Sequence, residues 1–194
     1  PNTVNSQLEN LTTNAHILSS SLVQSDTLEY QIRNFYPFPI AFPYRGISSI
    51  HEISEKYREQ LRVAENLLAF LANIGIELCC FCEVLDLDEN ITLTAPSLYK
   101  FFGGGISPGD WQNIAYSSGY LLRNVDDYSL AKSFSSLWFK GSKSKASAFT
   151  KNTKRLAELK NDYKHDRGPN ISIEFEEASA EVKSLLDQCY EEIS

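Results

Sequence analysis

The sequence predicts an all-α protein, a helical bundle of four to five main helices with an extended N-terminal strap rich in proline and aromatic residues. Three observations predict this class. Apolar residues recur every three or four positions over long stretches, helix-capping signals precede several of these stretches, and alternating strand-like patterns are nearly absent. At 194 residues and 42% hydrophobic content, the chain can bury one substantial core. We expect an N-terminal arm over residues 1–46 and one helical domain over residues 47–194.

The N-terminal arm is expected to contain a weak helix followed by the strap. Residues 5–24 show a loose helical pattern, formed by Leu8, Leu11, His16, Leu18, Leu22 and Val23 among many polar residues. In residues 35–47 (FYPFPIAFPYRGI), Pro37, Pro39 and Pro43 argue against a continuous helix and favour an extended path. The five aromatic side chains of this stretch are expected to pack against the bundle; a proline-rich ligand for another protein is the alternative.

The first strong helix is expected to begin at a capping box formed by Ser49 and Glu52. A helical apolar stripe follows and continues to the cysteine-rich segment. Its members are Tyr57, Leu61, Ala64, Leu68, Leu71, Ile74, Leu78 and Cys82. Because charged residues flank the stripe only in its first part, we expect an amphipathic first half and a buried second half.

A loop is expected over residues 86–107, and it ends in a run of three glycines. Without a preceding strand or a following lysine, this run indicates flexibility rather than a phosphate site. The next helix has a strong start signal, because Ser107 can cap it, Pro108 occupies the first position and Asp110 lies in the first turn.

Three more helices are expected in the remainder of the chain, over residues 128–138, 144–166 and 174–193. Gly168 and Pro169 separate the last two, because glycine supplies a left-handed stop and proline prevents continuation.

The composition indicates a soluble, cytoplasmic protein. No uncharged run of eighteen or more apolar residues is present, and the first residues have no secretory-signal pattern, so we expect no membrane contact. The four cysteines lack the spacing of a disulfide or zinc framework, and Cys79, Cys80 and Cys82 lie within an apolar helical stretch. We expect buried thiols in a reducing compartment, no metal site and no cofactor.

Charge is distributed unevenly along the chain. The net charge is −7, but residues 132–167 contain ten Lys or Arg against three Asp or Glu, a local charge of +7. A cationic face of this kind can attract phosphate although the whole molecule is acidic. The alternative is a solvated basic helix balanced by the acidic C-terminal segment.

One cluster near the end of the long basic helix has residues suited to phosphate chemistry. Asn161 and His165 are four positions apart and share a helix face, and Lys160 and Lys164 flank them. A protonated imidazole can donate a proton to a leaving oxygen, and an ammonium group can neutralise charge that develops on phosphate. The alternative is structural: Asn161 and His165 hydrogen-bond to nearby backbone at a helix end.

The stretch K-N-D-Y-K-H, residues 160–165, resembles the R-N-x-x-x-H signature of the HEPN superfamily of helical domains. The resemblance implies a metal-independent endoribonuclease that acts as a homodimer, because in that family the active cleft forms where two domains pair. Lys160 stands where the family has arginine, Asn161 where it has a polar residue, and His165 where it has histidine. Lysine lacks the planar fork with which arginine grips two phosphate oxygens, so this exchange is not conservative.

The resemblance further implies a catalytic role for each of the three residues. His165 would act as acid and base while the ribose 2′-hydroxyl attacks the adjacent phosphate, Lys160 would stabilise the phosphorane, and Asn161 would orient one of these groups. Salt-sensitive, nearly sequence-blind contacts to RNA are expected from Lys143, Lys145, Lys151, Lys154, Arg155, Lys164 and Arg167.

Three functions therefore remain open at the level of sequence, of which a small-molecule or nucleotide pocket within the bundle is supported only by the glycine run. The other two have more support. The first is an HEPN-like endoribonuclease of a toxin or defence system, with RNA as its substrate. The second is a non-catalytic helical interaction or sensor domain of a larger protein, in which the motif persists as architecture and the charge asymmetry serves a protein partner or a neighbouring domain.

Overall fold

The computed structural model describes residues 27–84, 105–140 and 145–193. Within these ranges it contains seven helices and one two-stranded hairpin, which confirms the all-α class. The helices are α2 (Leu28–Phe35), α3 (Phe38–Ile47), α4 (Ile53–Phe81), α6 (Pro108–Leu122), α7 (Ser129–Trp138), α8 (Ala148–Lys164) and α9 (Ser172–Ile193). The hairpin pairs β1 (Phe139–Lys140) antiparallel with β2 (Lys145–Ala146). The expected weak helix over residues 5–24 lies outside the described residues.

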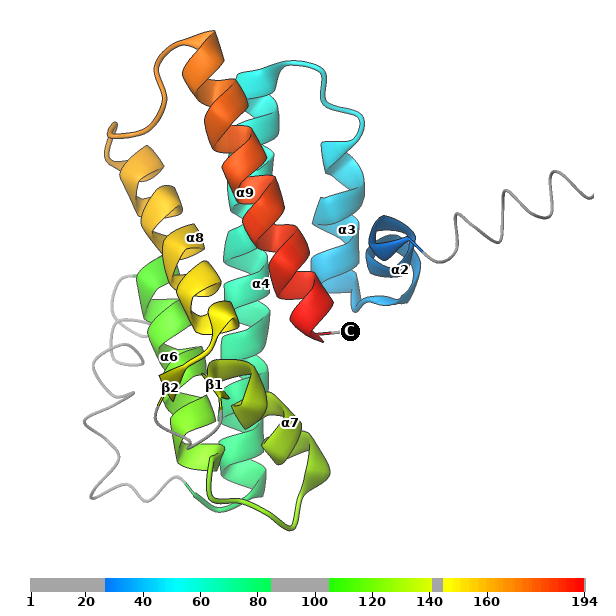
Figure 1. Ribbon diagram of the computed structural model, residues 1–194, viewed down its shortest axis with the longest axis vertical. Helices are drawn as coiled ribbons and strands as arrows, with labels where there is room; N and C mark the ends of the chain where they lie inside the picture. The colour runs from blue at the N-terminus through cyan, green and yellow to red at the C-terminus, as the bar shows by residue number, and fades with distance from the viewer. Residues whose placement is uncertain (1–26, 85–104, 141–144, 194) are drawn as a thin grey trace, which may run out of the picture.

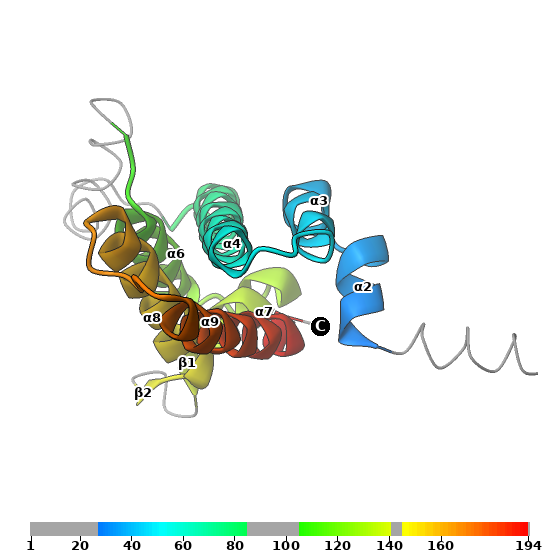
Figure 2. The ribbon, with the colours of Figure 1, turned by 90° about the horizontal axis from the view of Figure 1, so that it is seen from above.

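The long helix α4 is the centre of the bundle. It runs along the long axis of the molecule, with α3 beside its N-terminal half and α6 beside its C-terminal half, and it also packs against α8 and α9 (Figures 1 and 2). The core forms between these helices. Its largest fully buried side chains include Tyr57, Leu61, Leu67, Leu68, Ile114, Leu122, Trp138, Phe149, Leu156, Leu186 and Tyr190.

By length and composition, α4 is the one helix in the described part of the chain that could cross a membrane. Half of its apolar window is buried inside the bundle, as expected for the core helix of a globular domain. The predicted apolar stripe is buried except at Ile74 and Cys82, which are half-buried. The prediction of a buried second half is wrong, because Asn73, Glu77 and Phe81 in that half are exposed.

Helix α6 begins as the sequence predicts. The Ser107 hydroxyl accepts a hydrogen bond from the Asp110 backbone N–H at 3.2 Å, and the Asp110 carboxylate accepts one from the Ser107 N–H at 3.0 Å. The capping box predicted at Ser49 is wrong. Helix α4 is capped instead by the Glu52 carboxylate, which accepts hydrogen bonds from the N–H groups of Ser54 and Glu55 at 3.1 and 2.7 Å. Ser49 belongs to the preceding turn, where its hydroxyl donates to the Gly46 carbonyl at 2.8 Å.

The extended strap is also wrong, because Phe35 is the last residue of α2 and residues 38–47 form α3. Only the Tyr36–Pro37 junction has extended backbone. Pro39 is tolerated because it lies in the first turn of α3, where backbone N–H groups have no intrahelical partner. Pro43 lies inside α3 and costs that helix one hydrogen bond. Burial of Ile40, Ala41 and Tyr44 offsets this loss.

The hairpin β1–β2 shortens the long basic helix, which begins at Ala148 rather than near residue 144. The Ser147 hydroxyl donates to the Leu137 carbonyl and accepts from the Thr150 N–H at 3.0 Å. The Thr150 hydroxyl donates to the Trp138 carbonyl at 2.6 Å. These bonds join the end of α7 to the start of α8. Two-residue strands are too short to produce an alternating pattern in a sequence.

Candidate functional site

The predicted catalytic residues lie at the C-terminal end of α8. His165 is the C-cap: its side chain is exposed, and its backbone N–H donates to the carbonyls of Asn161 and Asp162 at 3.2 and 3.1 Å. The helix thus ends at the histidine itself, three residues before Gly168. The imidazole is open to solvent, as contact with a nucleic-acid strand requires.

Lys160 and Asn161 face other helices of the bundle. The Lys160 ammonium lies 3.2 Å from the Glu65 carboxylate on α4, and the lysine side chain is only 21% exposed. Asn161 lies against the first turn of α6, because a methyl group added at Gly109 would stand 3.5 Å from the Asn161 amide nitrogen. To act on phosphate, Lys160 would have to exchange its contact with Glu65 for the phosphate oxygens.

The predicted RNA-binding side chains fall into two groups. Arg155 and Arg167 are paired: the Arg155 guanidinium binds Glu181 at 2.7 Å, and Arg167 lies 3.1 Å from Asp162. The hydrogen bond to Glu181 raises the pKa of Arg155. The second group consists of four exposed lysines, none of which forms an ion pair with another described residue: Lys145, Lys151, Lys154 and Lys164. Lys143 lies outside the described residues.

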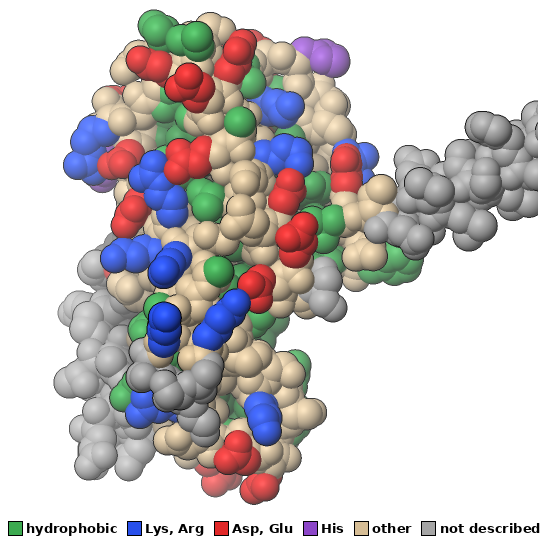
Figure 3. Space-filling model, viewed as in Figure 1, with side chains coloured by type: hydrophobic (Ala, Val, Ile, Leu, Met, Phe, Trp, Pro, Cys, Tyr) green, Lys and Arg blue, Asp and Glu red, His purple; other side chains and the backbone are tan. Residues whose placement is uncertain are grey.

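The surface over α8 is therefore mixed in charge. In Figure 3, Lys and Arg side chains over the upper, C-terminal part of α8 lie among Asp and Glu side chains, whereas its lower, N-terminal part carries Lys and Arg. The cation of Arg155, for example, is shared between Glu158 and Glu181. Such pairing reduces the field that a phosphate chain would feel, so the local excess of lysine and arginine overstates the basic character of this face.

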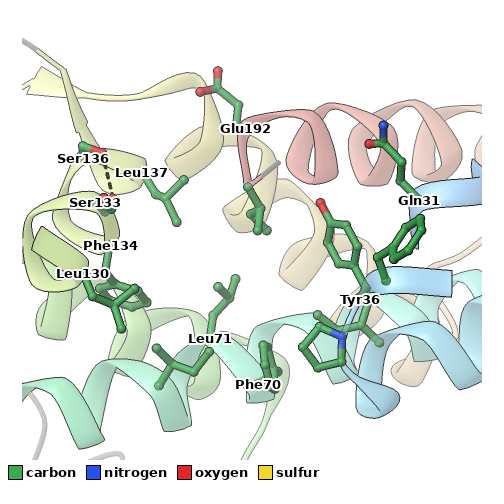
Figure 4. A pocket seen from close by; sticks show the side chains of 15 residues that line it. Gln31, Tyr36, Phe70, Leu71, Leu130, Ser133, Phe134, Ser136, Leu137 and Glu192 are labelled. Carbon is green, nitrogen blue, oxygen red and sulfur yellow. Dashed lines mark hydrogen bonds between the residues drawn. The ribbon is translucent and has the colours of Figure 1, made fainter. Parts of the chain in front are cut away.

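A long apolar groove follows one side of α4, and the sequence patterns did not identify it. Its central hollow, about 740 Å³, lies between α2, α4, α7 and the end of α9 (Figure 4). A second hollow of about 520 Å³ separates α3 from α4, and a third of about 400 Å³ separates α7 from the C-terminal half of α4. We call these the central, α3 and α7 hollows. Phe70 lines all three, so the hollows adjoin one another at this residue, and we call them together the α4 groove.

Large apolar side chains stand exposed along the α4 groove. Phe35, Phe38, Phe42 and Phe81 are 73%, 72%, 62% and 68% exposed. The rings of Phe38 and Phe42 stack with centroids 5.0 Å apart, which makes a ridge beside the α3 hollow. Leu130, on the wall of the α7 hollow, is also exposed. Scattered exposed hydrophobics are ordinary, but a contiguous set marks an interaction surface.

These exposures correct the expectation that all five aromatic side chains of residues 35–47 pack against the bundle. Tyr36 and Tyr44 do, because each makes an edge-on contact with Tyr190, at 5.6 and 5.7 Å between ring centroids. Phe38 and Phe42 are four residues apart on α3 and share the helix side that faces away from the core. The spacing was visible in the sequence, but it has this meaning only once the segment is known to be helical.

The groove is poor in groups that could perform chemistry. At the central hollow the polar side chains are Gln31, Tyr36, Ser133, Ser136 and Glu192, and the Ser136 hydroxyl donates to the Ser133 carbonyl at 2.7 Å (Figure 4). No group of three or more His, Cys, Asp or Glu residues that could hold a metal ion occurs in the described ranges. The groove is therefore suited to binding apolar surface.

The buried thiols are also poor candidates for chemistry. Burial raises the pKa of Cys79 and of Cys189 to about 12, so both remain protonated at neutral pH. Cys80 is exposed and Cys82 half-buried at the end of α4. This division agrees only in part with the expectation of buried thiols.

A scan against protein-family models and searches of curated proteins and of solved structures find no match to this chain. The resemblance to HEPN domains consequently rests on residues 160–165 alone. Functional inference therefore depends on the geometry of two surfaces, the end of α8 and the α4 groove.

Proposed function

We propose that this chain is a helical interaction module that binds a protein partner through the α4 groove. The observation that carries this proposal is the exposure of four phenylalanine side chains along one groove. Burying a phenylalanine stabilises a protein by about 1.5–3 kcal/mol relative to leaving it in water. A fold that leaves four of them on one surface forgoes this stabilisation until a partner covers them.

The form of the groove favours a folded partner with an apolar ridge. Its floor and walls are helices, so a ligand does not have to order them on binding. A partner helix laid along α4 can place apolar residues at intervals of three and four into the hollows. The mixed charge over α8 supports this function better than one based on electrostatic attraction.

Photo-crosslinking tests the proposal in the cells that make this protein. A benzophenone amino acid is introduced at Phe42 in one variant and at Ile173 in a control, because Ile173 is 61% exposed on α9 outside the groove. We expect adducts of defined mass from position 42, identified by peptide mass, and few from position 173. The purified partner should bind the parent protein and not the Phe42→Asp variant. Equal crosslinking at the two positions would refute the proposal.

A second candidate is metal-independent RNA cleavage at the end of α8, and the exposure of His165 favours it. In that reaction the 2′-hydroxyl loses its proton to solvent water, and its oxygen forms a bond to the adjacent phosphorus while the bond to the 5′-oxygen breaks. His165 in its protonated form would give a proton to the departing 5′-oxygen, and Lys160 would offset the charge on the phosphorane. The products are a 2′,3′-cyclic phosphate and a 5′-hydroxyl.

Cleavage of labelled RNAs in excess chelator tests this candidate. The parent protein, His165→Ala and His51→Ala are compared, because His51 is an exposed histidine just before α4 and serves as the matched control. Cleavage lost only in His165→Ala supports the candidate. Cleavage abolished by chelator, or unaffected by His165→Ala, excludes it.

A further inference from the structure

The exposed side of α4 along the groove carries a polar stripe that is symmetric about one point. Its residues succeed one another at intervals of four, seven and four, so they lie on one side of the helix. All are at least partly exposed. The stripe comprises Arg62, Asn66, Asn73 and Glu77. Its midpoint lies between Ala69 and Phe70.

The two ends of this stripe are opposite in charge. If a second α4 lies antiparallel across the midpoint, Arg62 of one copy faces Glu77 of the other, and Asn66 faces Asn73. If the second helix runs parallel, Arg62 instead faces Arg62, and Glu77 faces Glu77. The stripe is therefore complementary to itself in the antiparallel orientation alone.

We propose that the partner that binds the α4 groove is a second copy of this chain, with the two α4 helices antiparallel and related by a two-fold axis. The inference rests on the proposed function, that the groove is an interaction surface, and it names the partner. In a two-fold dimer every contact occurs twice, so two Arg62–Glu77 pairs form.

The shape of the groove supports the same arrangement. The ridge formed by Phe38 and Phe42 flanks the N-terminal half of α4, and the α7 hollow flanks the C-terminal half. Both adjoin Phe70 and therefore lie on the same side of α4. Reversing one copy about the midpoint places its ridge over the α7 hollow of the other copy. A hollow of about 400 Å³ can accept two aromatic rings, because a cavity of about 150 Å³ holds benzene.

The exposed apolar area supplies about half of a dimer interface. An aromatic side chain buries about 200 Å² when fully covered, so the exposed parts of Phe38, Phe42 and Phe81, which line the same hollows as the stripe, offer about 400 Å² on each protomer. A stable interface buries about 800 Å² per partner. The polar stripe and Leu130 lie between and beside these rings and supply the remainder. The Arg62–Glu59 contact of 3.7 Å is exposed and long, so it competes weakly with a new partner.

Sedimentation equilibrium of the 194-residue chain between 1 and 100 μM tests this inference. We expect the parent protein to approach twice its mass of 21.9 kDa with increasing concentration. Phe42→Asp should weaken self-association about 30-fold or more, as expected for a central aromatic contact. Ile173→Asp, which makes the same kind of change at a surface outside the groove, should leave self-association unchanged. Circular dichroism verifies that each variant is folded.

Charge reversal tests the antiparallel orientation separately. Arg62→Glu alone and Glu77→Arg alone should each weaken self-association about tenfold, because each creates two like-charge contacts in a two-fold dimer. The doubly substituted protein should regain the affinity of the parent to within about threefold. Failure of this rescue refutes the antiparallel pairing, and self-association that persists in Phe42→Asp refutes the use of the groove.

A protein that stays monomeric up to 100 μM overturns the inference outright. The proposed function is tested independently, because crosslinking at position 42 to a different protein would still support it. An adduct between two copies of this chain would support both.

Discussion

A methyl group added at Gly119 should destabilise this protein, whereas one added at Gly46 should stabilise it. Gly119 lies in α6 at the contact with α7, and a β-carbon there would stand 2.3 Å from Cδ1 and 2.8 Å from Cγ of Trp138. Carbon atoms in favourable contact are about 3.5–4.0 Å apart. Gly46 lies in α3 with no heavy atom within 4 Å of the same position.

The magnitude follows from two opposing contributions. Replacing glycine by alanine within a helix gains up to about 1 kcal/mol of helix propensity, and this gain applies at both positions. At Gly119 it is opposed by overpacking, which costs about 1–3 kcal/mol or more. The indole of Trp138 cannot easily move, because it is fully buried and the Phe149 ring packs edge-on against it at 5.1 Å.

Thermal unfolding measures the difference between the two variants. For a chain of this length, 1 kcal/mol shifts Tm by about 2–4 °C. We expect Gly119→Ala to lower Tm by about 5 °C and Gly46→Ala to raise it by about 2 °C. If Gly119→Ala is as stable as Gly46→Ala, the close packing of α6 on the Trp138 ring is not present, and α6 and α7 must be arranged differently.

Three further predictions concern the cap of α6, the thiols and the behaviour at high pH. Ser107→Ala should lower the free energy of unfolding by about 1 kcal/mol in urea titrations, because it removes the hydroxyl that caps α6, and an unchanged midpoint would contradict the capping box. A thiol-reactive dye should label Cys80 rapidly in the native protein, whereas Cys79 and Cys189 should react only on unfolding; rapid labelling of all four thiols would contradict their burial. Burial raises the pKa of Tyr44 from 10.0 to about 12. The contribution of Tyr44 to stability is therefore complete below pH 10 and is lost as the pH rises towards 12. Over that pH interval the Tyr44→Phe variant should lose less stability than the parent protein, as measured by urea unfolding at each pH.

The elements that the sequence predicts well are those whose signals are local. Ser107, Pro108 and Asp110 are adjacent, and the bonds of the capping box they form involve only those neighbours. The stripe of α4 is equally local, because a helix buries residues at fixed intervals whatever covers them. Both predictions are confirmed.

The strap is predicted incorrectly because the effect of a proline depends on its position in a helix. Pro37 precedes α3, Pro39 lies in its first turn and only Pro43 removes an internal hydrogen bond. The sequence shows three prolines and cannot show that the buried side of α3 contacts α4. The exposure of Phe38 and Phe42 is a consequence of that contact, which is why the groove could not be predicted either.

The candidate site at the end of α8 shows the same limit. The sequence predicts that Lys160, Asn161 and His165 lie together near a helix end. All three are at the end of α8, but Lys160 faces α4, Asn161 faces α6 and His165 is exposed. The sequence cannot predict that the carboxylate beside Lys160 comes from Glu65, which is 95 positions earlier in the chain and on another helix. The electrostatic state of a lysine depends on such contacts more than on its neighbours in sequence.

The two functional proposals can be separated by geometry, because a dimer through the α4 groove does not form a shared cleft at His165. The Tyr57 and Tyr163 rings contact at 5.5 Å, so the end of α8 lies level with Tyr57. Tyr57 is more than twelve residues from the midpoint of the stripe, or about 19 Å at 1.5 Å per residue. The two copies of His165 would then be roughly 35–40 Å apart along α4, too far to act on one phosphate. Mixing His165→Ala with Lys160→Ala should therefore restore no RNA cleavage if the groove forms the dimer, whereas restored cleavage would require a different interface, one that joins the ends of α8.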